Sequence, residues 1–246
     1  MPLIRVADVD PELFSSVRDP AARAASAAEV LRLERGSWQS GLEGHDPIGH
    51  FGLLIVEGIV MRRVRFGRRP VLELVGPGDV LRPWVGLAPD SALHQPSQWR
   101  VHQRAELAIL YRRFAVRMAQ WPEVPAAIMD RHARRMRLLS LHLSIAQLPR
   151  LRDGLIALFW FLADRWGRVT GDGVLVDVPL THEMLAGLVG ARRPAVTTTL
   201  GELQRTGEVS RRDDGRWLVH GQPPVELGEP EPSATADLTE RVARGI

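Results

Sequence analysis

One segment constrains the fold of this chain more than any other, and it lies between residues 181 and 221. It begins THEMLAGLVGARRPAVTTTLGELQ, in which the small residue Ala186 is followed by Gly190 four positions later and by Val196 six positions after that. This spacing lets two short helices cross closely over a tight turn, because the glycine can end the first helix in a left-handed conformation. The segment therefore predicts a helix-turn-helix with Ala186, Gly190, Val196 and Leu200 in its core.

The second helix of this motif is expected to begin around Arg192. Pro194 would then lie in its first turn, where the missing N–H of proline costs nothing and its fixed φ helps. Val196, Leu200 and Leu203 recur at i, i+4 and i+7, which predicts that they face inward. The side chains left on the outer surface are those of Arg192, Arg193, Thr197 and Thr198.

The sequence EVSRRDDGRWLVHG follows and predicts a β-hairpin with a tight turn at Asp214 and Gly215. Arg211, Arg212 and Arg216 would lie on this wing, beside a sugar–phosphate backbone. An arginine at the start of the second helix can pair with guanine in the major groove, so the motif favours DNA binding. The alternative, in which the same fold docks a protein or senses a ligand without specific DNA binding, stays open.

In the rest of the chain, the sequence pattern changes near residue 120 from β-prone runs to helical periodicity. Up to about residue 118, short β-prone runs alternate with glycine-rich turns, which is typical of an antiparallel barrel or sandwich. Residues 21–32 are expected to form a short helix leading into it. A pattern of this kind followed by helices and a winged motif predicts an α+β fold.

A long amphipathic helix is expected after Pro122. Its apolar residues fall three or four apart and predict one stripe, made of Ile128, His132, Met136, Leu139 and Leu143. The opposite face would carry Arg131, Arg134, Arg135 and Arg137. Such a helix can form a dimer seam or pack on its own barrel, and the pattern does not separate the two. A second, buried helix is expected from Leu151 to Trp166, followed by a short strand in VLVDVPL.

Composition narrows the possible functions. The chain of 246 residues has no cysteine, which excludes thiolate zinc sites, cysteine-held iron–sulfur clusters and cysteine nucleophiles. It also lacks lysine, so it has no P-loop, and no Gly-x-Ser-x-Gly motif occurs. We therefore expect no enzymatic activity, no metal and no cofactor. Neither an export signal nor a membrane-spanning run is recognisable, which predicts a cytoplasmic protein without a membrane partner.

Charge is distributed unevenly along the chain. Eight arginines and only three acidic residues occur between residues 130 and 168, whereas residues 226–240 are acidic and contain no arginine. A basic body suits a polyanionic partner such as DNA. The last stretch, from residue 223, is rich in proline and glutamate and is expected to be a flexible tail.

These motifs together resemble the Crp/Fnr superfamily of transcription regulators. LERG at 33–36, IVEG at 55–58 and LELVGPGD at 72–79 resemble the turns of the β-roll in that family. The resemblance implies a β-roll sensor-like domain at 1–118, a dimerisation helix at 119–147, a winged helix-turn-helix at 148–222 and the tail at 223–246. It also implies a homodimer on a palindromic double-stranded DNA site, and a contact with RNA polymerase.

The recognition helix departs from the pattern of the family. Members read bases with an Arg-Glu pair and a later arginine; Arg193 matches the first of these, whereas Pro194 and Thr198 stand at the other two positions. Arg193 is therefore the base contact that the resemblance implies. Thr197 and Thr198 are candidates by their position on the helix alone, and the preferred DNA site should differ from that of the best-known members.

The sensor-like part departs further. Cyclic-nucleotide-binding members have a Gly-Glu pair shortly after the Pro-Gly-Asp turn and an Arg-Ser or Arg-Thr pair beyond it. This chain has Arg82 and Pro83 at the first place, and residues 90–110 contain no arginine followed by serine or threonine. We therefore expect that cyclic AMP does not bind as it does in those relatives. An effector is either another small molecule or absent, and its binding residues are unknown from the sequence.

Overall fold

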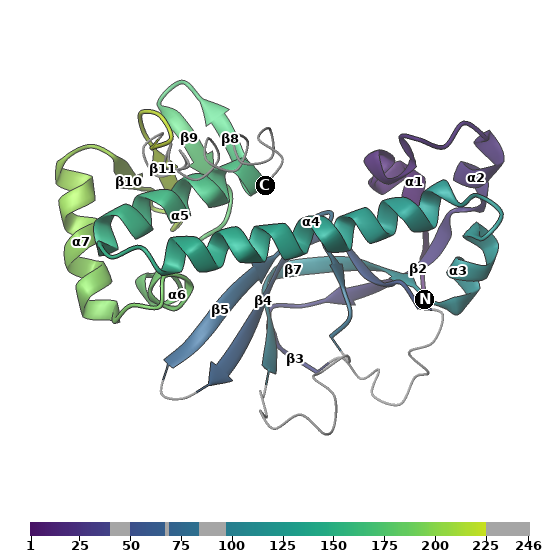
Figure 1. Ribbon diagram of the computed structural model, residues 1–246, viewed down its shortest axis with the longest axis horizontal. Helices are drawn as coiled ribbons and strands as arrows, with labels where there is room; N and C mark the ends of the chain where they lie inside the picture. Colours follow the sequence, from purple (N-terminus) through teal and green to yellow (C-terminus); the bar gives the residue numbers. More distant parts are fainter. Residues whose placement is uncertain (40–49, 67–68, 84–96, 225–246) are drawn as a thin grey trace, which may run out of the picture. The chain divides into compact units, whose positions relative to one another are not determined.

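The computed structural model describes residues 1–39, 50–66, 69–83 and 97–224, which form two compact units (Figure 1). The first unit comprises residues 1–146 and 182–193, and the second comprises residues 147–181 and the described chain from 194. The first unit contains β1 (Leu3–Arg5), α1 (Val6–Val9), η1 (Pro11–Phe14), α2 (Pro20–Ala25), β2 (Ala27–Leu33), β3 (Gly36–Trp38), β4 (Gly52–Phe66), β5 (Arg69–Val75), β6 (Val80–Leu81), β7 (Ser97–Leu110), α3 (Arg112–Met118), α4 (Glu123–Ala146) and α6 (His182–Leu188). The second contains α5 (Leu151–Trp166), β8 (Gly167–Thr170), β9 (Gly173–Val176), α7 (Arg193–Arg205, which starts at the boundary), β10 (Val209–Arg211) and β11 (Trp217–Val219).

The first unit is built on a seven-stranded antiparallel sheet with β4 and β7 as its central pair (Figure 1). The strand order is β1-β2-β7-β4-β5, with β3 also on β7 and β6 also on β4. The predicted α+β fold, an antiparallel β domain followed by helices and a winged motif, is confirmed. No helix among the described residues has both the length and the apolar content that a membrane crossing requires.

Strand β4 bends at a glycine. Its register with β7 shifts three times between Ile55 and Val60, which marks β-bulges. Gly58, at φ +86°, lies in the middle of these shifts, and a Cβ there would fall 2.0 Å from the carbonyl oxygen of Arg104. Only glycine fits this close approach of two backbones.

Side chains on the two faces of the sheet form two separate cores, because successive residues of a strand point to opposite sides. Leu54 and Ala108 pack with Phe14, Phe114 and Ile128, so this face is covered by the N-terminal helices, α3 and α4. Leu53, Ile55 and Leu107 pack on the other face, among residues of the strands themselves. The rolled sheet thus buries one face against helices and the other against itself.

The helix expected over residues 21–32 is wrong in its second half. Helix α2 ends at Ala25, and β2 starts at Ala27 and pairs with β1 and β7. Ala28 and Val30 are buried with period two, which is strand periodicity. Residues with good helix propensity form a strand here because two neighbouring strands supply the hydrogen bonds.

Helix α4 also differs from its predicted faces. Ile128 is fully buried, but Met136 and Leu143 are 69% and 60% exposed, so only part of the expected apolar stripe is buried within the described chain. Arg131 and Arg135 were expected on the solvent side, yet their side chains are only 11% and 16% exposed. The reason is that both meet carboxylates from distant parts of the first unit.

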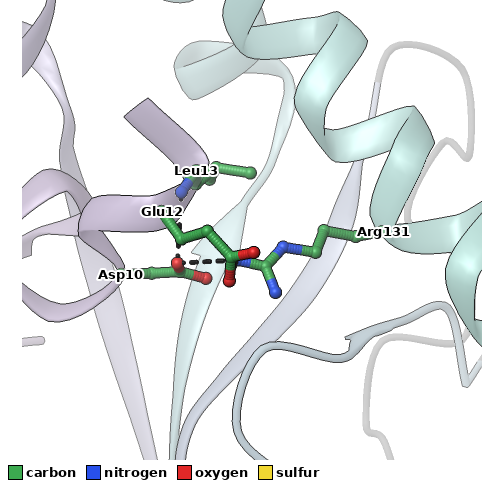
Figure 2. Close-up of polar contacts among 4 residues, drawn as sticks. All are labelled: Asp10, Glu12, Leu13 and Arg131. Atoms are coloured by element: carbon green, nitrogen blue, oxygen red, sulfur yellow. Dashed lines mark hydrogen bonds and ion pairs between the residues drawn. The ribbon is translucent and has the colours of Figure 1, made fainter. Parts of the chain in front are cut away.

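Arg131 is held by the N-terminal segment, as Figure 2 shows. Its Nη2 donates to Asp10 Oδ1 at 2.8 Å and to Glu12 Oε2 at 2.9 Å, and Asp10 Oδ1 also accepts from the Leu13 backbone N–H. A Cβ atom built on Gly78 would lie 2.9 Å from the Arg131 Nη1. A single guanidinium therefore connects η1 to α4 and lies close to the Gly78 turn.

The second unit contains a four-stranded antiparallel sheet, in the order β10-β11-β9-β8. The helix predicted from Leu151 to Trp166 is confirmed as α5 with those bounds, and the strand predicted in VLVDVPL is confirmed as β9 in its first part. Trp217 of β11 is fully buried and packs against Phe159 of α5 with the rings tilted by 44° and their centroids 5.3 Å apart. It donates its indole N–H to the Leu180 carbonyl. The flexible tail predicted from residue 223 lies, beyond Pro224, outside the described residues.

Candidate nucleic-acid interface

The first helix of the predicted motif, α6, ends as its sequence indicates. Leu185, Ala186 and Leu188 are buried. Gly190 has φ +66°, and the Ala191 N–H donates to the Ala186 carbonyl at 3.0 Å. A glycine in the left-handed region with such a bond is the Schellman ending of a helix, which confirms the conformation predicted for Gly190.

Within the first unit, α6 is supported from two elements. His142 of α4 is buried, and its Nε2 lies 2.8 Å from the Leu188 carbonyl oxygen near the end of α6. Gly187 faces Leu72 of β5, whose Cδ1 would lie 2.5 Å from a Cβ at this position. The glycine therefore lets α6 approach β5 more closely than any other residue would.

The second helix, α7, begins at Arg193 with Pro194 as its second residue, which confirms the predicted start. Val196, Leu200 and Leu203 are fully buried, as their spacing predicts. Thr198 donates its hydroxyl proton to the Pro194 carbonyl at 3.2 Å, which leaves the Oγ1 lone pairs available as acceptors. The exposed side chains at the start of the helix are those of Arg192, Arg193, Thr197 and Thr198.

The predicted wing hairpin is confirmed, with a longer turn than expected. Strands β10 and β11 pair from Val209 and Val219 to Arg211 and Trp217. The Arg212 N–H donates to the Arg216 carbonyl, which closes the turn, and Gly215 within it has φ +81°. The connection therefore runs over five residues from Arg212 to Arg216 rather than over two.

The three wing arginines differ in their electrostatic surroundings. Arg211 and Arg212 are exposed, form no ion pair within the described chain, and Arg211 stands 5.8 Å from the ring centroid of Trp217. Arg216 instead pairs with Asp214 at 2.7 Å and with Asp177. The hydrogen bonds that Arg216 donates to Asp214 and then to Asp177 raise the pKa of Arg216, and the Arg216 guanidinium lowers the pKa of Asp214.

The sequence pattern did not reveal the partner of Arg216 across the domain. Asp177 lies 39 positions earlier, directly after β9, and only the pairing of β9 with β11 brings it beside the wing. The adjacent Asp214 was a visible signal, since a carboxylate two residues away readily pairs with an arginine. Arg216 is therefore more fully charge-compensated than Arg211 or Arg212.

These surfaces offer hydrogen-bond donors and positive charge but no reactive group. Arg192, Arg193, Arg211 and Arg212 are exposed without ion pairs in the described residues. Nor do the described histidines and carboxylates gather anywhere into a group of three that could hold a metal ion. Guanidinium groups at the start of a helix and on a wing suit the binding of phosphate and of base edges.

The helix-turn-helix part of the chain matches a known family of protein domains. Residues 150–220 match the family described as "Crp-like helix-turn-helix domain". This match confirms the resemblance to the Crp/Fnr superfamily of transcription regulators, and it places a Crp-like helix-turn-helix domain in this part of the chain.

Particular relatives extend this finding. The Regulatory protein CysR of Synechococcus elongatus is 36% identical over 74 residues, 29% of this chain and 36% of that protein, so the match spans about a third of the relative. A cyclic nucleotide-binding domain containing protein from Listeria monocytogenes has a TM-score of 0.62 at 14% identity, over 86% of this chain and 97% of that one. TTHB099, a CRP-family transcriptional regulator from Thermus thermophilus, has a TM-score of 0.57 at 20% identity, over 80% and 94%. These two structures share the fold, and both CysR and TTHB099 are described as regulators.

Proposed function

We propose that this protein is a homodimeric, sequence-specific DNA-binding transcription regulator of the Crp/Fnr type. The observation that carries the proposal is the helix-turn-helix match over residues 150–220 together with four exposed arginines without ion pairs at the start of α7 and on the wing. Residues 1–118 would serve as the sensor-like domain, 119–147 as the dimer helix and 148–222 as the DNA-binding domain. A contact with RNA polymerase forms part of the same proposal.

Within this proposal, α7 enters the major groove and the wing follows the backbone. Arg193 contacts a base edge, with Arg192, Thr197 and Thr198 beside it. Arg211 and Arg212 bind phosphates. Arg216 contributes less to phosphate binding than the other two, because Asp214 and Asp177 already share its charge.

The dimer is supported by the outer face of α4. Met129, Met136 and Leu143 are exposed at intervals of seven residues and are 61%, 69% and 60% accessible. The small residues Ala126, Ala133 and Ser140 alternate with them at intervals of three and four. An exposed heptad of large and small side chains is the seam of a two-stranded coiled coil, so we assign this face to a second copy of the chain.

Selection of bound sites from random double-stranded DNA, with purified protein and no effector, tests the central proposal. A selected palindrome should lose affinity steeply between about 50 and about 200 mM salt, with a log–log slope of about −0.9 per phosphate contact. Arg193→Ala should cost about 1–3 kcal/mol and relax base preference, whereas Arg211→Ala should weaken binding to all sequences alike. Arg104→Ala, on the exposed side of β7, is the matched control.

A protein that selects no site at low salt, even with cell extract supplying small molecules, contradicts DNA binding and favours the protein-docking alternative. Light scattering tests the dimer separately. Met136→Glu should yield a monomer, because a charge then lies in the seam, whereas Val116→Glu on α3, which is equally exposed, should stay dimeric. A dimeric Met136→Glu variant would show that the seam lies elsewhere.

The sensor proposal is that the protein responds to a small molecule other than cyclic AMP or acts without an effector. Arg82 is half-buried, and the residues in the part of the chain corresponding to the nucleotide cassette include no Gly-Glu pair. Calorimetry is expected to detect no micromolar binding of cyclic AMP. Tight binding would contradict this expectation without affecting the DNA-binding proposal.

A further inference from the structure

A small cavity in the first unit has an unusual lining. It has a volume of about 200 Å³ and lies between β4, β7, α4 and the chain after β6. Arg62, Arg82 and Arg135 contribute to its wall, together with Trp99, His132 and Ser97. None of the described lining residues is acidic.

Two buried donors in this wall lack an acceptor. Within the described chain, neither Arg62 Nε nor Trp99 Nε1 makes a hydrogen bond, although both atoms are inaccessible to solvent. Buried N–H groups in folded proteins almost always have a partner, and leaving one unsatisfied costs about 1–3 kcal/mol. Two such donors on residues that line one cavity point to a hydrogen-bond acceptor at this place.

The charge around the cavity indicates what kind of acceptor it is. Glu73 of β5 is outside the lining, and its carboxylate pairs with Arg135 at 2.6 Å and with Arg62 at 3.7 Å. One carboxylate thus serves two guanidinium groups. It holds them in place, while their combined charge remains positive toward the cavity.

The wall is also rigid where the donors lie. The Arg62 guanidinium stands 5.7 Å from the centroid of the Trp99 ring, and Trp99 packs edge-on against Trp38 at 6.0 Å. Trp99 and Arg62 are paired across β4 and β7 in the register of the sheet. Donors fixed by neighbouring strands and ring contacts lose little entropy when a ligand binds.

We propose that this cavity binds a small oxyanion, a carboxylate or a phosphate, through Arg62 Nε–H and Trp99 Nε1–H. The anion would supply the acceptors that both donors lack and would balance the charge that Glu73 leaves on the two arginines. A volume of about 200 Å³ is enough for a small ion such as phosphate. A cyclic nucleotide is several times larger.

Calorimetry on the full chain without DNA tests this site, with inorganic phosphate and malonate as probes and sodium chloride at equal ionic strength as the blank. We expect saturable binding of one ion per chain. Binding of phosphate alone assigns a phosphate site, binding of malonate alone assigns a carboxylate site, and binding of both assigns a general oxyanion site. Failure of both probes to bind above the chloride blank overturns the proposal.

Two variants test the donors individually. Trp99→Phe keeps an aromatic ring but removes the five-membered part of the indole with its N–H, and Arg62→Lys keeps the charge and removes Nε; each should weaken binding about tenfold or more. Trp166→Phe and Arg104→Lys change residues that are not among the described lining residues, and these variants should bind within about twofold of wild type. If either folded donor variant binds as tightly as wild type, the assignment is wrong. Since no DNA is present, this outcome is independent of the proposed DNA binding.

Discussion

Arg131→Met removes a guanidinium that bonds to Asp10 and Glu12 of the N-terminal segment in the first unit (Figure 2). Its partner Asp10 has a side chain only 12% exposed, and Asp10 Oδ2 is buried without a hydrogen bond from the described residues. The carboxylate therefore depends on Arg131 for its counter-charge. Methionine preserves most of the packing volume, so the substitution isolates the loss of charge and hydrogen bonds.

The expected cost is about 3 kcal/mol of unfolding free energy. A hydrogen bond between charged groups contributes about 1.5–3 kcal/mol, and a carboxylate left nearly buried without its partner adds to the loss. The second bond, to Glu12, contributes less than about 1 kcal/mol because that side chain is 72% exposed and solvent screens the pair. Asp10 keeps its bond to the Leu13 N–H, which limits the total.

Urea unfolding followed by tryptophan fluorescence and circular dichroism measures this loss. The matched control is Arg104→Met, whose pair with Glu34 is exposed on both sides at 3.4 Å and should change stability by less than about 0.5 kcal/mol. A double-mutant cycle with Asp10→Asn should give a coupling energy above about 1 kcal/mol. Equal stability of the Arg131→Met and Arg104→Met variants would refute the reasoning.

Three further predictions concern stability and titration. Gly58→Ala should destabilise the protein by more than about 2 kcal/mol, because φ is +86° and a Cβ would lie 2.0 Å from a β7 carbonyl oxygen. Gly201→Ala in α7, with open space around it, should stabilise the protein by about 0.5–1 kcal/mol. Thermal unfolding distinguishes the two signs. Burial lowers the pKa of His132, so the unfolded chain takes up a proton more readily, and the free energy of unfolding should fall as pH drops through about 6.5. Urea unfolding at several pH values measures this dependence. A His132→Gln variant whose stability depended on pH as strongly as that of wild type would contradict the prediction. Burial, and then Glu29, raises the pKa of the chain's single tyrosine, Tyr111, to about 12. The unfolded chain therefore loses the phenol proton first, and the free energy of unfolding should fall as pH rises from about 10 toward about 12. An ultraviolet absorbance titration of Tyr111 with a midpoint near about pH 10 would contradict this prediction.

Sequence patterns predicted those parts of the fold whose cause is local. Helix α5 has the bounds that its apolar run and its flanking residues indicate, and Gly190 ends α6 in the left-handed region. The buried positions of α7 also follow directly from their spacing. In each case the deciding interactions join residues a few positions apart, so they are legible in the order of the amino acids.

The faces of α4 were not legible in this way. Arginine in a helix is ordinarily a solvent-facing residue, and Arg131 and Arg135 were placed accordingly. Their partners, Asp10 and Glu73, lie 121 and 62 positions away, and no residue near α4 in the sequence indicates these pairs. Both arginines are turned inward, whereas Met136 and Leu143 of the expected apolar stripe are exposed, and the proposed dimer would cover them.

The amino-acid order alone thus determined the α+β class, the helix-turn-helix with its wing, and the candidate DNA-binding residues, because helix periodicity, turn glycines and capping act over a few residues. Tertiary structure decided which charges are compensated and which remain available. Arg216 meets Asp177 only through the pairing of β9 with β11, and Arg62 and Trp99 share a cavity wall only because β4 pairs with β7. Electrostatic and hydrogen-bond partners are chosen by distance in space, and folding brings together groups whose separation along the chain carries no information about that distance.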